Sequence, residues 1–227
     1  MRILLEVIVA TVADARQAAT GGADRLEVVR DIASGGLTPS PDLVRAIAAE
    51  TGLPLRVMVR GNDGYDTNGA ELATLRRAAG DFAAAGVDGI VLGFARDGEP
   101  LLDAVQGVID AAPAARVTYH RAFDTLRDPC RAIRQLSAIP QIDRILTDGG
   151  QGSAVERCDR FQRLSGAAGT RMTVIAGSRV DEQMLSMIAA TGCVREVHVG
   201  RAARPGHDRG ATVSADLVRR LRAIADK

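Results

Sequence analysis

Short β-rich runs alternate with Ala-rich helical stretches along the whole chain, and this alternation limits the possible folds more than any other feature. Eight such runs can be distinguished in the 227 residues. One run and one helical stretch together take about 28 residues, which is the length of a βα module. The eight runs are Ile3–Val9, Arg25–Val29, Leu55–Val59, Gly89–Gly93, Arg116–His120, Arg144–Thr147, Met172–Ala176 and Glu196–Val199.

Strands that alternate with helices pair in parallel. Eight consecutive units without a linker or a shift in composition predict a single α/β domain over residues 1–227, a closed (β/α)8 barrel of the TIM type. An open, doubly wound sheet is the alternative, and it usually carries a Gly-rich phosphate loop after its first strand. Here Ala10–Ala13 follows that strand, so the closed barrel is favoured.

The helical stretches carry recognisable start signals. Ser40 and Asp128 each precede a proline, which combines an N-cap side chain with a first-turn Pro. Asp181 and Ser214 are placed to cap the last two helices. These four residues predict where the corresponding helices begin.

The overall charge and composition exclude several classes of partner. The formal net charge is only +1, aromatic residues make up 3% of the chain, and tryptophan is absent. A nucleic-acid or anionic-membrane binder would show a basic surface, and a base-stacking platform would need aromatic side chains. No apolar run approaches the ~18 residues of a membrane span, and Glu6 comes too early for a signal peptide. We therefore expect a cytoplasmic protein that binds neither nucleic acid nor membranes.

Ionisable residues lie within or just after several apolar strands. In a barrel of this kind, catalytic and binding groups gather at the carboxyl ends of the strands. Buried charges can also form purely structural ion pairs, such as Glu27 with Arg60. Five ionisable groups in one core exceed what stability requires, so we favour a functional cluster. The five residues are Glu6, Glu27, Arg60, His120 and His198.

The types of these residues indicate acid–base chemistry on an anion. The catalytic candidates are Glu6, Glu27, His120 and His198, with Glu27 or His120 as general acid or base. We expect both glutamates inside the barrel mouth, within reach of Arg60 or an imidazole. The arginines would clamp a carboxylate or phosphate, and glycines after the last two strands would offer N–H groups, although such glycines often mark only a turn. The ligand-binding candidates are Arg60, Arg121, Asp124, Gly177, Gly200 and Arg201.

The three cysteines show no metal-binding or disulfide pattern. Cys130, Cys158 and Cys193 are odd in number and contain no CxxC pair. We expect reduced thiols that act as small buried hydrophobic side chains and do not share a metal ion.

Seven segments, in order along most of the chain, carry a specific pattern. They are Leu4–Val7, Gly22–Glu27, Ser34–Ser40, Val57–Arg60, Gly86–Gly93, Val117–Asp124 and Asp143–Thr147. The Gly-Gly-Leu-Thr-Pro-Ser loop and the Thr-Tyr-His-Arg-Ala-Phe-Asp strand end are the most distinctive. In these segments the chain resembles the CutC family of copper-homeostasis proteins.

The resemblance implies a cytosolic (β/α)8 barrel, a role in copper homeostasis without a defined reaction, and self-association into a homo-oligomer. The chain departs from the family at Val28–Val29, where relatives usually have a cysteine, and at Gly61–Asn62, where they tend to show a second arginine. Cu(I) favours thiolate and thioether ligands, and Met58 is the only soft residue near the charged cluster.

Three functions therefore stay open. The first, implied by the resemblance, is a copper-binding or copper-buffering protein. The second is a lyase, isomerase or hydrolase that acts on a small anionic metabolite through the charged cluster. The third adds Zn²⁺ or Mn²⁺, which two carboxylates and two imidazoles suit better than Cu(I). We expect the barrel mouth to bind a small anion more readily than Cu(I).

Overall fold

The computed structural model describes residues 2–227, in which eight barrel strands alternate with eight α-helices. The barrel strands are β1 (Leu4–Val9), β2 (Arg25–Val28), β3 (Leu55–Met58), β4 (Gly89–Leu92), β7 (Arg116–Tyr119), β8 (Ile142–Thr147), β9 (Thr173–Ala176) and β10 (Glu196–Val199). The helices are α1 (Val12–Thr20), α2 (Pro41–Thr51), α3 (Gly69–Ala84), α4 (Leu102–Ile109), α5 (Pro129–Ser137), α6 (Ala154–Ala168), α7 (Glu182–Thr191) and α8 (Ala215–Ala225).

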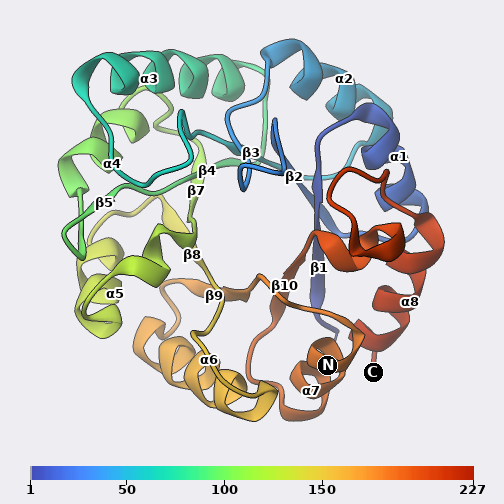
Figure 1. The fold of residues 1–227 in the computed structure, drawn as a ribbon. Coiled ribbons are helices and arrows are strands. Elements are labelled where there is room, and N and C mark those ends of the chain that lie inside the picture. The colour runs from blue at the N-terminus through green and yellow to red at the C-terminus, as the bar shows by residue number, and fades with distance from the viewer. Residues whose placement is uncertain (1) are drawn as a thin grey trace.

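All eight strands pair in parallel and close in the order β1-β10-β9-β8-β7-β4-β3-β2, with the helices around them (Figure 1). The predicted (β/α)8 barrel is confirmed, and the open sheet is excluded because β1 pairs with both β2 and β10. The sequence did not predict a small antiparallel hairpin, β5 (Ala95–Arg96) and β6 (Glu99–Pro100), before α4. Its two-residue strands are too short to show a hydrophobic period.

The predicted helix starts are confirmed. Ser40, Asp128, Asp181 and Ser214 are the N-caps of α2, α5, α7 and α8, and each side chain accepts a backbone N–H from the first turn. Helices of a barrel must shield the strands on one face and meet solvent on the other. None of the helices in residues 2–227 is long and apolar enough to cross a bilayer.

Side-chain alternation along the strands separates two different interiors. On β1, Leu5, Val7 and Val9 are fully buried in the large apolar core that includes helix residues. Glu6 and Ile8 point the other way, into the barrel lumen, because neighbours in a strand face opposite sides. A small apolar cluster in the lumen is formed by Ile8, Val29, Met58 and Val91.

Ion pairs fill the amino-terminal half of the lumen. Arg25 Nη2 lies 2.6 Å from Glu196 Oε2, and Arg144 Nε lies 2.9 Å from the same oxygen. Arg56 is fully buried and lies 2.7 Å from Asp88 and 2.9 Å from Asp143. Each of these charges has an opposite partner, as burial requires. We call this set the lower network: Arg25, Arg56, Asp88, Asp143, Arg144 and Glu196.

The cysteines lie outside the lumen. Cys158 and Cys193 are buried, as expected for small hydrophobic side chains. Cys130 is exposed, so the expectation is wrong for this residue. It is the second residue of α5, in the first turn, and the helix turns this position toward solvent.

Candidate functional site

A cavity of about 680 Å³ opens at the carboxyl ends of the barrel strands. Seven predicted site residues line it: Glu27, Arg60, His120, Arg121, His198, Gly200 and Arg201. Three others, Glu6, Asp124 and Gly177, lie outside the lining. The sequence therefore located the cavity, and the structure separates residues that face it from residues that act behind it.

Positive charge dominates the cavity wall. Five arginines face three carboxyl groups there, so the site has an excess of cations. The arginines are Arg60, Arg121, Arg179, Arg201 and Arg209, and the acids are Glu27, Asp63 and Asp181. Such a wall favours anionic ligands, because a cleft with low-dielectric sides concentrates the field of its charges.

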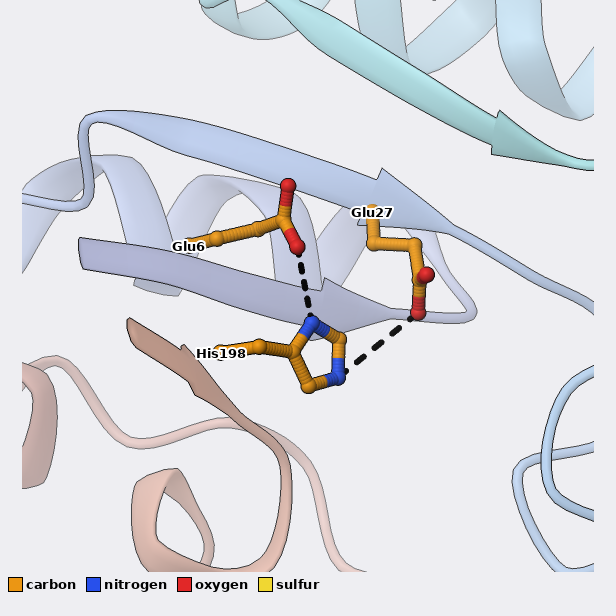
Figure 2. A group of neighbouring side chains, drawn as sticks. All are labelled: Glu6, Glu27 and His198. Atoms are coloured by element: carbon orange, nitrogen blue, oxygen red, sulfur yellow. Dashed lines mark hydrogen bonds and ion pairs between the residues drawn. The ribbon is translucent and has the colours of Figure 1, made fainter. Parts of the chain in front are cut away.

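Glu6 and His198 form a hydrogen-bonded pair inside the barrel (Figure 2). The strand register sets Glu6 directly beside both His198 and Arg25. Glu6 Oε1 lies 2.8 Å from His198 Nδ1, and Oε2 lies 2.5 Å from Arg25 Nε. Burial opposes ionisation of Glu6, but the charge of Arg25 and the hydrogen bond and charge of His198 hold its pKa well below the usual 4.5. Glu6 is therefore a lasting anion that orients the His198 ring.

The other nitrogen of His198 faces Glu27. His198 Nε2 lies 3.7 Å from Glu27 Oε2, and Figure 2 shows the two glutamates at opposite edges of the imidazole ring. Burial lowers the pKa of His198, but the charge of Glu27 and the hydrogen bond and charge of Glu6 together raise it above 6.5. Since Nδ1–H is directed at Glu6, the exchangeable proton of His198 sits on the side of Glu27.

Glu27 is the buried carboxyl group that faces the cavity. Burial raises its pKa from 4.5 to about 7, and the nearby charge of Glu6 adds to this effect, while His198, Arg25 and Arg60 offset part of it. Its Oε1 is buried and has no hydrogen-bond partner among residues 2–227. A carboxyl group with a pKa near neutrality can both accept and release a proton at physiological pH.

His120 is held as a neutral hydrogen-bond donor. Its Nδ1 accepts the backbone N–H of Ala122 at 3.1 Å, so the ring proton must sit on Nε2. Burial and the charge of Arg60 lower the pKa of His120 to about 3. Nε2 is buried and bonds to no other residue in the described chain. His120 therefore offers an N–H to a ligand, and it is not the general base that the sequence allowed.

Arg60 organises the loops at the rim. Its guanidinium donates to the backbone carbonyls of Gly64 at 3.2 Å and Gly35 at 3.4 Å, and also to Asp63. The structural ion pair with Glu27 is not formed, since Glu27 pairs with His198. The charge of Arg60 still faces the cavity, although most of its N–H groups are occupied.

Arg121 faces the cavity, and Asp124 stands behind it. Arg121 Nε lies 2.9 Å from Asp124 Oδ2, and its Nη2 lies 3.1 Å from Asp148. The other oxygen of Asp124 accepts the Thr147 hydroxyl at 2.6 Å. Asp124 was expected to bind ligand, but its oxygens are engaged with protein groups and it lies outside the cavity lining. It is a positioning residue for Arg121.

The two glycines expected to hold an anion behave differently. The N–H of Gly177 donates to the carbonyl of Thr147 at 2.9 Å, so it is not free for a ligand. A Cβ at this position would lie 2.5 Å from the Leu146 side chain, so close packing against Leu146 accounts for the glycine. Gly200 lines the cavity, next to Arg201 on its rim.

One group of residues has the spacing of a metal site. Glu6, Glu27 and His198 offer ligand atoms within 4.8 Å of one another, the one such group in residues 2–227. However, Glu6 already bonds Arg25 and His198 Nδ1, which leaves only Nε2 and Glu27 as free donors. Zinc sites use three or four protein ligands, and the protonated Nε2 of His120 cannot supply another. Two free donors are fewer than a zinc site uses, so the residues do not fit the Zn²⁺ ion that the sequence left open.

Copper fits the cavity no better. Met58 contributes the only sulfur to the lining, which contains no cysteine. The buried Cys158 and Cys193 lie outside the lining. Cu(I) prefers several thiolate or thioether ligands, and one thioether among carboxylates and guanidinium groups does not provide them.

Sequence reasoning missed several residues that shape the site. Arg25 and Glu196 precede Glu27 and His198 by two positions, so the same strand period could have placed them in the lumen. Tyr65 packs beside the site, with its ring centroid 5.4 Å from that of His120, at a tilt of 56°, and 5.0 Å from Cζ of Arg60. It lies in a loop, where no periodic signal exists.

Comparison with known proteins agrees with this barrel and its motifs. The sequence profile of the CutC family matches residues 3–203. The chain belongs to the CutC family. A curated relative named as a family protein CutC, from Xanthomonas campestris pv. campestris (strain B100), is 33% identical over 196 residues, which cover 86% of this chain and 81% of that protein.

Solved structures similar to this CutC-family chain support the fold. A structure described as a candidate copper homeostasis protein CutC, from Streptococcus agalactiae, has a TM-score of 0.78 and 24% identity, and covers 86% of this chain and 97% of that one. Orotidine 5′-phosphate decarboxylase from Pyrococcus horikoshii OT3 has a TM-score of 0.65 and 14% identity, with coverage of 98% and 99%. At these identities the likeness shows the fold alone, because barrels host many chemistries.

Proposed function

We propose that the protein is an enzyme that moves protons on a small anionic metabolite bound at the barrel mouth. One observation carries the proposal: Glu27 Oε1 and His120 Nε2 are buried, lack partners in the described chain, and belong to residues that line the same cavity. A buried polar atom without a partner costs free energy, so such atoms mark places where a ligand completes the structure.

Each group then has a distinct task. Glu27, with a pKa of about 7, takes a proton from carbon next to a carbonyl group and later returns one. His120 donates its Nε2–H to the carbonyl oxygen as negative charge develops there. His198, oriented by Glu6, lies next to Glu27, where its charge affects the pKa of Glu27. His198 can also exchange a proton with Glu27 through Nε2. The cationic wall holds the acidic end of the metabolite, so the reaction class is that of an isomerase or lyase.

Solvent exchange tests the proposal without a known substrate. The protein is incubated in D₂O with a panel of 2-oxo acids and sugar phosphates, and deuterium uptake at carbon is followed by ¹H NMR. We expect uptake by at least one compound, and a fall of about 10²- to 10⁴-fold in Glu27→Gln. Glu50→Gln, at the exposed partner of Arg16, is the matched control and should keep full activity. Equal uptake with Glu27→Gln, or no uptake across the panel, would contradict proton transfer by Glu27.

Copper binding is the second candidate and rests on membership of the CutC family, with Met58 as the one sulfur ligand that the cavity could offer. Calorimetry with Cu(I) decides between the two. Tight binding of one Cu(I) per chain that is lost in Met58→Leu would favour copper, and Met187→Leu, on α7, is the control. The cytoplasmic location and homo-oligomer that the family implies stay predictions, to be checked by cell fractionation and light scattering.

A further inference from the structure

The loop that follows β9 has an uncommon backbone shape at the rim of the cavity. Ser178 and Arg179 have φ values of +52° and +50°, a left-handed conformation that residues other than glycine rarely adopt. Both residues, together with Val180, line the cavity. Two such residues in succession persist only where surrounding structure holds them.

Arg157, on α6, holds this loop from behind. Its guanidinium donates to the carbonyls of Gly177 at 3.3 Å, Ser178 at 2.8 Å and Arg179 at 3.2 Å. Its Nε donates to the carbonyl of Asp148 at 2.8 Å, which ties the loop to the neighbouring one. Arg157 is buried and lies outside the cavity lining. Three consecutive carbonyl groups therefore point away from the cavity, toward one buried cation.

The geometry of the peptide bond determines where the N–H groups of this loop point. In a planar trans peptide, the C=O of one residue and the N–H of the next point in opposite directions, and the chain has no cis peptide in residues 2–227. The N–H groups of Ser178, Arg179 and Val180 therefore point away from Arg157. None of the three donates a hydrogen bond within the described chain. Successive backbone N–H groups that are free of other partners can donate together to one anion.

We infer that the backbone of residues 178–180 is a phosphate-binding subsite, and that the metabolite of this cavity is a phosphate monoester. Three successive N–H groups without a partner supply donors for the several oxygens of a phosphate, whereas a carboxylate has two oxygens. Arg201, exposed on the rim, adds positive charge. The carboxylate of Asp181 caps α7 by accepting the N–H of Met184 at 2.8 Å, so it is engaged with its own helix. The inference rests on the proposed function, since it names the chemical class of that ligand.

The direct test is ¹H–¹⁵N NMR of the full chain during titration with inorganic phosphate at constant ionic strength. We expect the amide signals of Ser178, Arg179 and Val180 to move downfield together and to saturate with one dissociation constant. Chloride should not move them. Absence of these shifts, or shifts confined to arginine side chains, would overturn the inference.

Variants separate the backbone from the side chains. Arg157→Lys keeps the charge but cannot reach three carbonyls at once, so phosphate affinity should fall about tenfold or more, whereas Arg163→Lys, exposed on the same helix, should not change it. Ser178→Gly keeps the N–H and tolerates positive φ, so affinity should stay within about threefold. Unchanged binding by Arg157→Lys, or its loss in Ser178→Gly, would refute a backbone site; if Arg157→Lys does not fold, the Ser178→Gly result and the wild-type titration still decide.

Two further ligands define the chemistry. Glycerol 3-phosphate should shift the same three amides at least as strongly as inorganic phosphate, and acetate should not. Equal shifts with acetate would show a general anion site and overturn the assignment to phosphate. The wild-type protein separates the two proposals: amide shifts without any deuterium exchange across the panel reject only the proton-transfer enzyme, and exchange without amide shifts rejects only the phosphate subsite.

Discussion

Both halves of the barrel lumen contain buried ionisable residues, but the two halves differ in whether these residues have partners. In the amino-terminal half, every charge of the lower network has a partner, as with Arg56 between Asp88 and Asp143. At the mouth, Glu27 Oε1 and His120 Nε2 are as deeply buried but have no partner among residues 2–227. Burial of charge is thus common to both halves, and only the completeness of pairing differs.

This difference shows how to read charges inside a barrel. A paired network stabilises a particular packing of the strands, and removing one member leaves the other buried alone. Incomplete pairing instead leaves interaction capacity for a ligand. Arg25 joins the two halves, because it contacts both Glu196 below and Glu6 above. Substitutions on either side should therefore have opposite consequences.

The largest effect is expected for Arg25→Met. This change leaves Glu6 without its cation and removes one partner of Glu196, so the free energy of unfolding should fall by about 3 to 5 kcal/mol. Urea denaturation at neutral pH measures it. Arg16→Met breaks an exposed pair with Glu50 and is the control, with no measurable loss. A loss for Arg25→Met as small as for the control would mean that the lower network does not stabilise the fold.

At the mouth, Glu27→Gln should stabilise the protein at high pH, in contrast to the loss of stability expected for Arg25→Met. The carboxyl group ionises near pH 4.5 in the unfolded chain and near pH 7 in the folded one, so wild-type stability falls as pH rises between these values. At pH 8 the variant should be about 1 to 3 kcal/mol more stable relative to wild type than it is at pH 4.5. Urea denaturation at both pH values measures this. A difference between variant and wild type that does not change with pH would contradict the raised pKa.

A smaller effect is expected on the pKa of His198 when Glu6 is replaced. Glu6→Gln removes the hydrogen bond to Nδ1 and a nearby negative charge, both of which raise the pKa of His198. The pKa of His198 should therefore fall, as measured by NMR titration of its ring protons. Glu50→Gln should leave it unchanged. A His198 pKa that does not respond to Glu6→Gln would show that Glu6 does not control the mouth.

The smallest expected effect is the absence of a titration at His120. His120 has a pKa near 3, with burial and the charge of Arg60 as its causes, so its ring should stay neutral from about pH 5 to about pH 8. ¹⁵N shifts of the ring should report a proton on Nε2 throughout. A titration within this range, or a proton on Nδ1, would remove the donor role assigned to His120.

Much of the fold was predictable because it rests on local patterns. The strand runs, the caps at Ser40 and Asp128, and the absence of a phosphate loop after β1 each reflect short-range chemistry. The cluster of Glu6, Glu27 and His198 followed from mid-strand charges and the period of a strand. Arg25 obeys the same rule, and its place in the lumen could have been derived.

The rest depends on contacts between distant loops. Arg157 reads in sequence as an ordinary helix arginine, and only the fold brings it beneath the carbonyls of Gly177–Arg179. The left-handed Ser178 and Arg179 carry no glycine to signal their conformation. The tautomer of His120 likewise depends on one backbone N–H, that of Ala122. Such features are set by tertiary structure, which no local pattern encodes.

The most direct test of the contrast between paired and unpaired charge is the titration of the Glu27 carboxyl group itself. Glutamate labelled with ¹³C at the carboxyl carbon, assigned with Glu27→Gln, gives its midpoint by NMR. We predict a midpoint near pH 7 that rises further when phosphate binds in the cavity, because a bound anion disfavours a second negative charge. A midpoint near the ordinary 4.5 that phosphate does not move would contradict a ligand site built around Glu27.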